Sequence, residues 1–248
     1  MSPRLPVSPL PPSRLVVSRL LVSRLLVSWS SGKDSAWALH RLHQSGAYDL
    51  AGLLTTVNSA FDRVAMHSTR RALLEAQARA AGLPLFPVPL PWPCSNAEYE
   101  SRMRDACASA VASGVEFVAF GDLFLEDVRR YREDHLTGTG LEPVFPLWGE
   151  DTRRLAEEMI DNGLRARLVC VDPRKLPAEF AGREFDATLL RDLPPGVDPC
   201  GENGEFHTVV YAGPMFREPI PIESGEVVER DGFVFTDVRL SQPAAVPV

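Results

Sequence analysis

Cysteine is scarce in this sequence, and long apolar runs are absent. The 248 residues include four cysteines, at positions 94, 107, 170 and 200, and none forms a CxxC pair. This argues against a zinc site built on such pairs and against the disulfide framework of a small secreted domain. No apolar stretch approaches the roughly 18 to 20 residues of a membrane span. We therefore expect reduced thiols in a cytoplasmic protein with no membrane partner.

A surplus of positive charge is also missing. The formal net charge is −7 at pH 7, with 26 lysines and arginines against 33 aspartates and glutamates. This balance argues against broad, sequence-independent binding of nucleic acid, although it does not exclude a local basic groove. The hydrophobic fraction of 45% and the charged fraction of 24% are those of an ordinary globular protein.

Acidic residues are absent before Asp34, where the sequence instead repeats a pentapeptide. A proline-rich leader precedes Ser-Arg-Leu-Val-Val and two copies of Ser-Arg-Leu-Leu-Val. A period of five fits neither a helix nor a strand. We expect residues 1–22 to be a poorly ordered extension, either similar to a transit peptide in its acid-poor composition or produced by a start codon assigned too early. Residues 242–248 are expected to be a frayed tail.

What is present begins with a nucleotide-type loop. Residues 25–36 read Leu-Leu-Val-Ser-Trp-Ser-Ser-Gly-Lys-Asp-Ser-Ala, an apolar strand, a hydroxyl-rich turn and the start of a helical pattern. The turn offers backbone N–H groups, the helix directs its positive dipole end at a ligand, and Lys33 adds a charge. Val27 and Asp34 occupy the positions where a Walker A loop needs glycine and Ser or Thr. We call residues 28–35 the serine loop.

The serine loop resembles the PP-loop of the ATP pyrophosphatase superfamily, usually written SGGxDS. Ser31 stands where the first glycine of that pattern is expected. The resemblance implies cleavage of ATP between its α- and β-phosphates, with activation of a carbonyl or carboxyl group by adenylation. Serine-rich turns before helices are common, and a turn that binds nothing is the alternative.

Strand-like and helix-like segments alternate after the serine loop. Further strands are predicted at 50–57, 85–90 and 115–120, and helices from 36, from Ser68 or Thr69 as a cap, and from Ser95 as a cap. Pro87 and Pro89 place the strand at 85–90 near a sheet edge. The alternation predicts an α/β fold with a doubly wound, Rossmann-like parallel sheet that binds ligands at the carboxyl ends of its strands.

The character of the sequence changes after residue 140. A helix at 152–162 and a strand at 166–171 are followed by proline-rich connections, and Asp231-Gly232 predicts a hairpin with a type I′ turn. We expect a nucleotide-binding domain over 23–140 and a smaller mixed α+β substrate domain over 141–241. The segment 152–171 suits either one.

A second dense motif lies at residues 198–208, Asp-Pro-Cys-Gly-Glu-Asn-Gly-Glu-Phe-His-Thr. We call it the Gly-Glu motif. Glu202 and Glu205, followed by His207, suit recognition of a polar or cationic substrate, and the glycines permit close approach of backbone. On these residues alone, a turn that carries polar side chains but binds no substrate is an equal alternative.

The serine loop and the Gly-Glu motif together resemble the diphthine–ammonia ligase family, whose GEGGE(Y/F)(E/H)T-type signature matches residues 201–208. Intermediate stretches agree, at 118–129, 146–148 and 213–216. The variants Ser-Ser-Gly-Lys and Glu-Asn-Gly-Glu-Phe-His look more like the bacterial branch. Diphthamide belongs to archaeal and eukaryotic elongation factor 2. The resemblance therefore supports the HUP-type PP-loop fold, ATP use and ligase chemistry better than it supports diphthine as the substrate.

The resemblance implies attack of a carboxylate on the α-phosphate of ATP, loss of pyrophosphate, and attack of ammonia on the acyl-adenylate. Such chemistry depends on positioning and charge stabilisation rather than on a protein nucleophile. Asp34 and Asp122 are candidate Mg²⁺ ligands. The implied catalytic residues are Lys33, Asp34, Glu202, Glu205 and His207. The implied ATP contacts are Ser28, Trp29, Ser30, Ser31, Gly32, Lys33, Asp34, Ser35, Thr55, His67, Gly121 and Asp122. The implied substrate contacts are Glu126, Arg129, Gly201, Glu202, Asn203, Gly204, Glu205, His207 and Thr208.

Two other functions are consistent with the sequence. One is another PP-loop enzyme that modifies tRNA or a small molecule, although a thiolase of that kind needs a cysteine pair. The other is a non-catalytic sensor of adenine nucleotides, which would not need Lys33, Asp34 and the carboxylates of the Gly-Glu motif. The expected partners are ATP, ammonia and a carboxylate on a small molecule or protein side chain, and a homodimer is one candidate assembly.

Overall fold

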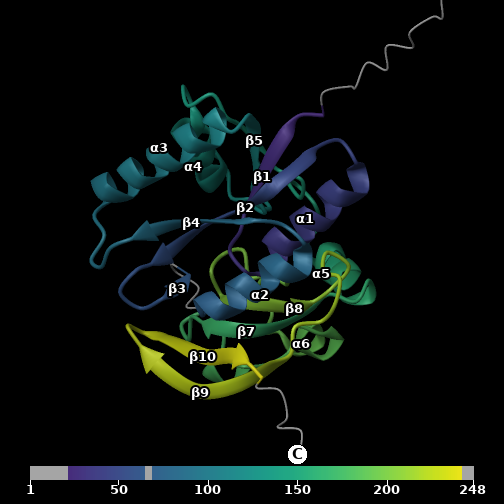
Figure 1. Ribbon diagram of the computed structural model, residues 1–248. Coiled ribbons are helices and arrows are strands. Elements are labelled where there is room, and N and C mark those ends of the chain that lie inside the picture. Colours follow the sequence, from purple (N-terminus) through teal and green to yellow (C-terminus); the bar gives the residue numbers. More distant parts are fainter. Residues whose placement is uncertain (1–21, 65–68, 242–248) are drawn as a thin grey trace, which may run out of the picture.

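The computed structural model describes residues 22–64 and 69–241. The expected extension, apart from Val22, and the expected tail lie outside these residues, as do His67 and Ser68. The described chain forms two sheets, one mostly parallel and one antiparallel (Figure 1). No helix within the described ranges is long and apolar enough to cross a membrane.

The parallel sheet carries strand β1 at its centre. Its parallel strands run in the order β4, β2, β1, β5, β6, and β3 adds to the end of β2 in the antiparallel sense. The expectation for 85–90 is confirmed, because β4 pairs with β2 alone in this sheet. The bounds are β1 Arg24–Ser28, β2 Asp49–Asn58, β3 Arg63–Val64, β4 Leu85–Leu90, β5 Val115–Ala119 and β6 Glu142–Val144.

Helices cover both faces of the parallel sheet, which confirms the doubly wound α/β fold. Leu25 and Val27 of β1 pack with α1 and α2, whereas Leu26 between them packs with residues of α3 and α4. This alternation follows from the two-residue repeat of a strand whose two faces are both buried. The bounds are α1 Lys33–Ser45, α2 Arg71–Ala81, α3 Asn96–Ala112 and α4 Glu126–Leu136.

The antiparallel sheet follows in the order β8, β7, β10, β9. In the hairpin between β9 and β10, Arg230 pairs with Phe233, and the turn residues Asp231 and Gly232 have φ values of 51° and 78°. Two positive φ values fit the predicted type I′ turn. The bounds are α5 Thr152–Asp161, β7 Arg165–Val171, the 3₁₀ helix η1 Ala178–Phe180, α6 Ala187–Asp192, β8 Phe206–Ala212, β9 Ile222–Arg230 and β10 Phe233–Leu240.

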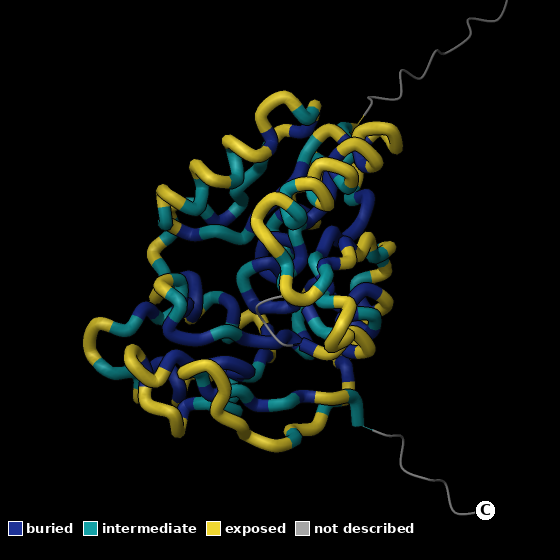
Figure 2. Tube along the Cα trace, turned by 90° about the vertical axis from the view of Figure 1, so that its left-hand side faces the viewer, coloured by how far each residue is buried: buried dark blue, intermediate teal, exposed yellow. Residues whose placement is uncertain are grey.

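The two sheets share one hydrophobic core. A single cluster of buried side chains includes Leu25 of β1, Leu74 of α2 and Val209 of β8. Helices α1 and α2 therefore lie between the sheets, and Figure 2 shows buried chain running continuously through the middle of the molecule. Strand β7 belongs to the second sheet, whereas β6 belongs to the first although it follows residue 140. The division of the chain at residue 140 stays a proposal.

One helix start differs from expectation. The residue before the first turn of α2 is Arg70, and no side chain caps that end. Ser68 or Thr69 was expected as the cap; Ser68 lies outside the described residues, and the Thr69 hydroxyl is buried with no hydrogen-bond partner in the described part of the chain. Arg70 instead forms a bridge with Arg63 of β3 and binds Asp237 of β10. Long-range contacts therefore set the start of α2. Ser95 does cap α3, since its hydroxyl accepts a hydrogen bond from the Glu98 N–H.

Candidate functional site

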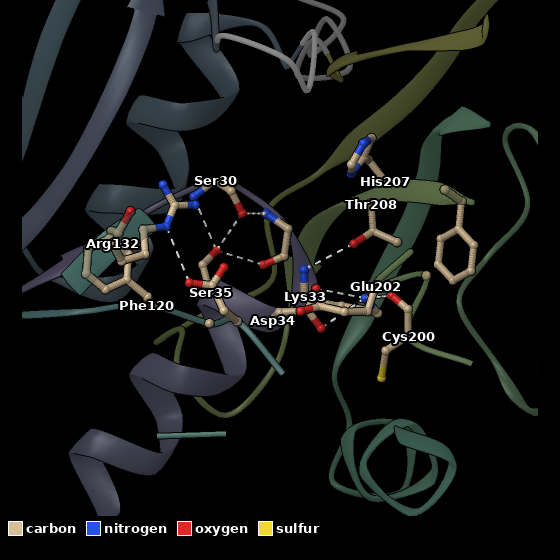
Figure 3. Close-up of a pocket in the computed structure, with 16 residues that line it drawn as sticks. Ser30, Lys33, Asp34, Ser35, Phe120, Arg132, Cys200, Glu202, His207 and Thr208 are labelled. Carbon is tan, nitrogen blue, oxygen red and sulfur yellow. Dashed lines mark hydrogen bonds and ion pairs between the residues drawn. The ribbon is translucent and has the colours of Figure 1, made fainter. Parts of the chain in front are cut away.

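A cavity lies at the carboxyl end of β1, between the serine loop and the Gly-Glu motif. It also reaches the segment that follows β5 and one arginine of α4. In Figure 3, Ser30 and Ser35 lie near Phe120 and Arg132, and Lys33 lies near Cys200, Glu202 and Thr208. The lining residues are Ser28, Ser30, Gly32, Lys33, Asp34, Ser35, Phe120, Gly121, Asp122, Arg132, Cys200, Gly201, Glu202, Phe206, His207 and Thr208. The structure thus brings together two motifs that lie about 170 residues apart.

The serine loop turns sharply at Ser31. Ser31 has a φ of 71°, a left-handed conformation that glycine adopts at little cost and other residues avoid. This geometry explains why glycine is the expected residue at that position. The Ser30 hydroxyl accepts a hydrogen bond from the Gly32 N–H at 3.3 Å and lies 3.1 Å from the Ser35 hydroxyl. Ser30 and Ser35 thus hold the loop closed over the start of α1.

Thr208 of β8 caps helix α1 from a distant part of the chain. Gly32 is the residue before the first turn of α1 and has no side chain with which to cap it. The Thr208 hydroxyl accepts a hydrogen bond from the Lys33 N–H at 3.1 Å. A side chain on Gly32 would approach the Thr208 carbonyl oxygen to 3.3 Å, so the glycine allows β8 to lie against the loop.

Lys33 is buried, with 2% of its surface exposed, and lies between the two motifs. Its ammonium group binds both carboxylate oxygens of Asp34, at 3.0 and 2.9 Å, and the carbonyl oxygen of Cys200. It also lies over the rings of Phe185 and Phe206, at 5.6 and 5.5 Å. Burial acts to lower the pKa of Lys33, but the surrounding negative charge, above all Asp34, raises that pKa above its ordinary value. Lys33 therefore stays charged at neutral pH.

Gly121 lets the segment after β5 reach the serine loop. A Cβ atom on Gly121 would lie 2.7 Å from the backbone carbon of Asp34, which is closer than backbone atoms permit. Asp122 follows Gly121, and its carboxylate Oδ2 atom forms an ion pair with the Nε of Arg132 on α4 at 3.4 Å. The Arg132 guanidinium lies 5.1 Å from the centre of the Phe120 ring. A cation and a carboxylate thus face each other at the cavity wall.

Two titratable groups of the Gly-Glu motif line the cavity in shifted states. Burial raises the pKa of Glu202 to about 7, against the opposing effect of the Leu123 N–H that donates to its Oε1 atom. Burial, together with the nearby charge of Lys33, lowers the pKa of His207 to about 4. Near neutral pH, Glu202 is thus able to accept or release a proton, and His207 is uncharged.

A second, larger cavity adjoins the first and shares Ser28, Ser30, Phe120 and Arg132 with it. Its volume is about 540 Å³ and its wall is mostly apolar, from Leu54, Leu90, Tyr99 and Met103 among others. The hydroxyl of Thr55 on this wall is buried and has no hydrogen-bond partner among the described residues. A mostly apolar cavity of this volume is typical of a site for a small ligand.

The family of the chain follows from sequence comparison. A sequence model of the diphthamide synthase N-terminal domain matches residues 23–142, and one of the diphthamide synthase C-terminal domain matches residues 151–239. The chain belongs to the diphthamide synthase family. The Rossmann-like PP-loop fold and the two-motif cavity are consistent with that membership.

Several curated relatives carry the name diphthine–ammonia ligase. The one from Bos taurus is 26% identical over 84% of this chain and 86% of its own length. The one from Homo sapiens is 31% identical over 50% of this chain and 48% of its own length. The one from Schizosaccharomyces pombe is 30% identical over 46% of this chain. That match spans only 20% of the yeast protein, so the chain corresponds to part of some relatives.

Not every residue expected in the site lies on the wall of the first cavity. Trp29 and Thr55 line the second cavity, and the hydroxyl of Ser31 is buried without a partner among the described residues. Glu126, Arg129, Asn203, Gly204 and Glu205 line neither cavity. The Arg129 guanidinium instead lies 4.7 Å from both the Phe145 and the Trp148 ring centres. His67 lies outside the described residues.

Glu205 is buried and holds the Gly-Glu motif together. Its Oε1 atom accepts hydrogen bonds from the Asp198 N–H and the Asn203 side-chain amide, both at 3.1 Å. The Asp198 carboxylate in turn accepts from the N–H groups of Cys200 and Glu202. Glu205 thus shapes the loop that carries Glu202, and Glu202 is the carboxylate that reaches the cavity.

Sequence reasoning missed Arg132, Phe120, Cys200 and Phe206 as cavity residues. Arg132 lies three positions after Arg129, close to one turn of α4, so the helical repeat offered it as an alternative to Arg129. Cys200 and Phe206 lie within or beside the Gly-Glu motif, but their contacts with Lys33 join residues far apart in sequence. No local pattern signals such contacts.

The donor chemistry of the cavity fits Mg²⁺ bound together with phosphate. No group of three His, Cys, Asp or Glu side chains is arranged to hold a metal ion anywhere in the described ranges. Mg²⁺ is normally bound by one or two carboxylates plus substrate phosphates and water, so a complete protein cage is not required. Asp122 and Glu202 supply carboxylates on the cavity wall. Both oxygens of Asp34 are bound by Lys33, so Asp34 would have to exchange that partner.

Proposed function

We propose that this chain is an ATP-dependent carbon–nitrogen ligase that adenylates a carboxylate, releases pyrophosphate, and transfers ammonia to the acyl-adenylate. The supporting observation is the single cavity in which the serine loop faces the Gly-Glu motif. The names of the relatives support ligase chemistry in this family. The pyrophosphate-releasing, AMP-forming step and the acyl substrate are the parts that need an experiment.

The two adjoining cavities suit the two halves of ATP. The adenosine would occupy the larger, mostly apolar cavity, whose wall includes Thr55 and Tyr99. The triphosphate would extend past Ser30 toward the N-terminal end of α1, where backbone N–H groups and the helix dipole favour an anion. Arg132 lies on the walls of both cavities and would contact the α-phosphate between them.

Charge around the phosphates comes from Lys33 and Arg132. Lys33 would stabilise the leaving pyrophosphate by exchanging part of its contact with Asp34 for a phosphate oxygen. Mg²⁺, held by Asp122 together with phosphate oxygens and water, would neutralise further negative charge. Lys33 and Arg132 already line the cavity in the absence of ligand, and such preorganised charge favours electrostatic stabilisation.

Glu202 would prepare ammonia for attack. Ammonium has no lone pair, so one proton must leave before nitrogen can form the new bond. The Glu202 carboxylate, whose pKa is about 7, accepts that proton. The nitrogen then attacks the acyl carbon, the carbon–nitrogen bond forms, the bond from carbon to the AMP oxygen breaks, and the surplus proton on nitrogen passes to the departing AMP phosphate. Neutral His207 on the same wall would donate or accept a hydrogen bond without adding charge.

The name of the relatives points to diphthine as one acyl substrate, and the bacterial-like motif variants point to another carboxylate. Supplying each candidate substrate in a separate assay distinguishes the two possibilities. Purified protein is incubated with ATP, MgCl₂ and ammonium chloride, with diphthine-bearing elongation factor 2 or with a panel of small zwitterionic carboxylates. AMP and pyrophosphate should form in the presence of the true substrate, together with an amide product one mass unit lighter than the acid.

Hydroxylamine makes this experiment independent of the ammonia site. In place of ammonia it traps an acyl-adenylate as a hydroxamate, which mass spectrometry detects. A Lys33→Met variant should form neither hydroxamate nor AMP. Production of ADP and phosphate alone would contradict the proposal. ATP binding without any turnover across the panel would favour the nucleotide sensor instead.

A further inference from the structure

Gln77 forms the centre of a buried hydrogen-bond network that the proposed chemistry does not use. It lies on α2 with 0% of its surface exposed. Its Oε1 atom accepts from the Trp29 Nε1–H at 3.0 Å. Its Nε2 atom donates to the carbonyl oxygens of Ser31 at 3.0 Å and Val210 at 2.7 Å. A primary amide is tolerated at such a depth when its polar atoms are paired in this way.

The Ser31 carbonyl oxygen receives a second donor, the Val210 N–H of β8, at 3.0 Å. Donors from α2 and β8 therefore hold this one oxygen in the protein interior. Because a peptide unit is planar and trans, the Ser31 C=O and the Gly32 N–H point in opposite directions. Fixing the carbonyl turns the Gly32 N–H toward the Ser30 hydroxyl and the cavity that Gly32 lines.

The conformation held in this way is unfavourable for serine. Ser31 has a φ of 71°, and within the described chain its buried hydroxyl has no hydrogen-bond partner that could compensate. The two bonds to its carbonyl oxygen are among the contacts that favour this turn. Loss of the Gln77 donor should let the Ser31–Gly32 peptide rotate more freely, because only the Val210 N–H and the 3.3 Å bond from the Gly32 N–H to the Ser30 hydroxyl then restrain it.

We propose that Gln77 is a positioning residue for phosphate binding. Together with the Val210 N–H it holds the Ser31–Gly32 peptide in the left-handed turn that directs the Gly32 N–H at a phosphate. The inference rests on the proposed function for the identity of that ligand as ATP. It adds that the serine loop depends on the second sheet, since Val210 belongs to β8.

The test compares Gln77→Met with Leu74→Ala in the full chain. Leu74 is buried on the same helix, so its truncation should lower the melting temperature without touching the loop. Calorimetric titration with Mg-ATP and with pyrophosphate should show about tenfold weaker binding to Gln77→Met than to the wild type. Adenosine binding, followed by ligand-observed NMR, should be unchanged. Leu74→Ala should bind all three as the wild type does.

Rescue by glycine separates positioning from a loss of stability. In the double variant Gln77→Met, Ser31→Gly, ATP affinity should recover by about fivefold, because glycine adopts the left-handed turn without the cost that serine has. Ser31→Gly alone completes the cycle. If Gln77→Met does not fold, Gln77→Asn gives a second comparison, because its shorter amide draws back from the Ser31 carbonyl oxygen without adding a charge.

Two results with the Gln77→Met variant alone would overturn the inference: wild-type affinity for pyrophosphate in the folded variant, or an equal loss of adenosine and pyrophosphate binding. A wild-type protein that binds ATP but forms no AMP would contradict the ligase proposal and leave the role of Gln77 intact. Weakened phosphate binding that glycine at position 31 does not restore would likewise overturn the inference.

Discussion

Glu202 and Glu205 show how the same residue type acquires different roles three positions apart. Gly201 and Gly204 both have left-handed φ values, 70° and 79°, and a Cβ on Gly201 would lie 2.9 Å from the Phe206 carbonyl oxygen. The resulting tight turns direct Glu202 to the cavity and Glu205 into the loop. The sequence identified both carboxylates as candidates, but only the turn geometry distinguishes them.

The raised pKa of Glu202 gives a testable pH dependence. In the proposed reaction the ionised carboxylate accepts the proton from ammonium, so kcat/KM for ammonia should rise as pH increases through about 7. Glu202→Gln keeps the acceptor for the Leu123 N–H but cannot take up a proton. Its amide formation should fall roughly a hundredfold, and the rise near pH 7 should disappear. An unchanged pH profile in the variant would exclude Glu202 as the base.

Glu202→Gln should also change the pH dependence of stability, because the pKa of Glu202 is raised by folding, whereas folding lowers the pKa of most carboxylates. The folded protein holds the Glu202 proton more tightly than the unfolded chain, whose pKa is the ordinary 4.5. The contribution of Glu202 to stability is therefore fully present below about pH 4.5 and is lost as pH rises from there through about 7. Glu202→Gln should thus raise the melting temperature at pH 8 and change it little at pH 4. Differential scanning calorimetry at the two pH values measures this.

At the scale of single elements, the start of α1 depends on a strand made much later in the chain. Thr208 of β8 supplies the hydroxyl that the Lys33 N–H needs. Thr208→Val keeps the shape and removes the acceptor, so it should cost about 1 kcal/mol of stability and weaken ATP binding. Thr208→Ser keeps the acceptor and is the matched control. Urea denaturation and ATP titration of both variants check this, and equal behaviour of Val and Ser would contradict it.

The elements themselves were largely predictable from sequence because their signals are local. Alternation of apolar runs with helical patterns gave the parallel sheet, Pro87 and Pro89 gave its edge, and Asp231-Gly232 gave the hairpin. The cap expected at Thr69 was wrong because Arg70 is held by Asp237 from another sheet. Gln77 did give a sequence signal, since it is a polar residue on the inward stripe of α2 with Leu73 and Leu74.

At the scale of the whole molecule, the relation between the two sheets was not predictable. Gln77 contacts Val210 across 133 positions, and the Lys33 N–H contacts Thr208 across 175. No periodicity or motif encodes which loop meets which strand at such separations. The sequence could therefore name both halves of the candidate site, but the structure was needed to show that they form one cavity.

Asp237 links the second sheet to the edge of the first. Hydrogen bonds from Arg70, and less strongly from Arg63, hold the pKa of Asp237 below its ordinary value. Its contribution, about 1 kcal/mol for a partly exposed pair, is present above the unfolded pKa and is lost as pH falls through the lower folded pKa. Asp237→Asn should therefore reduce the melting temperature at pH 7 and reduce it less near pH 3.

The control for Asp237→Asn is Asp231→Asn, which makes the same charge change in the exposed turn between β9 and β10. Asparagine tolerates the left-handed conformation of that turn, so the melting temperature of Asp231→Asn should equal that of the wild type at both pH values. An equal loss at pH 7 from both variants would show that net charge, rather than the link between the sheets, sets the difference.

The contacts of the serine loop also affect the order in which the protein can fold during its synthesis. A ribosome makes residues 28–35 early, yet Cys200, Thr208 and Val210, which pair with that loop, emerge near the end of synthesis. N-terminal segments generally fold first during synthesis. A nascent chain can thus assemble much of its parallel sheet while its nucleotide loop still lacks these partners. Under the proposed function, incomplete chains would neither bind nor cleave ATP. Nucleotide binding would begin only once the chain is complete.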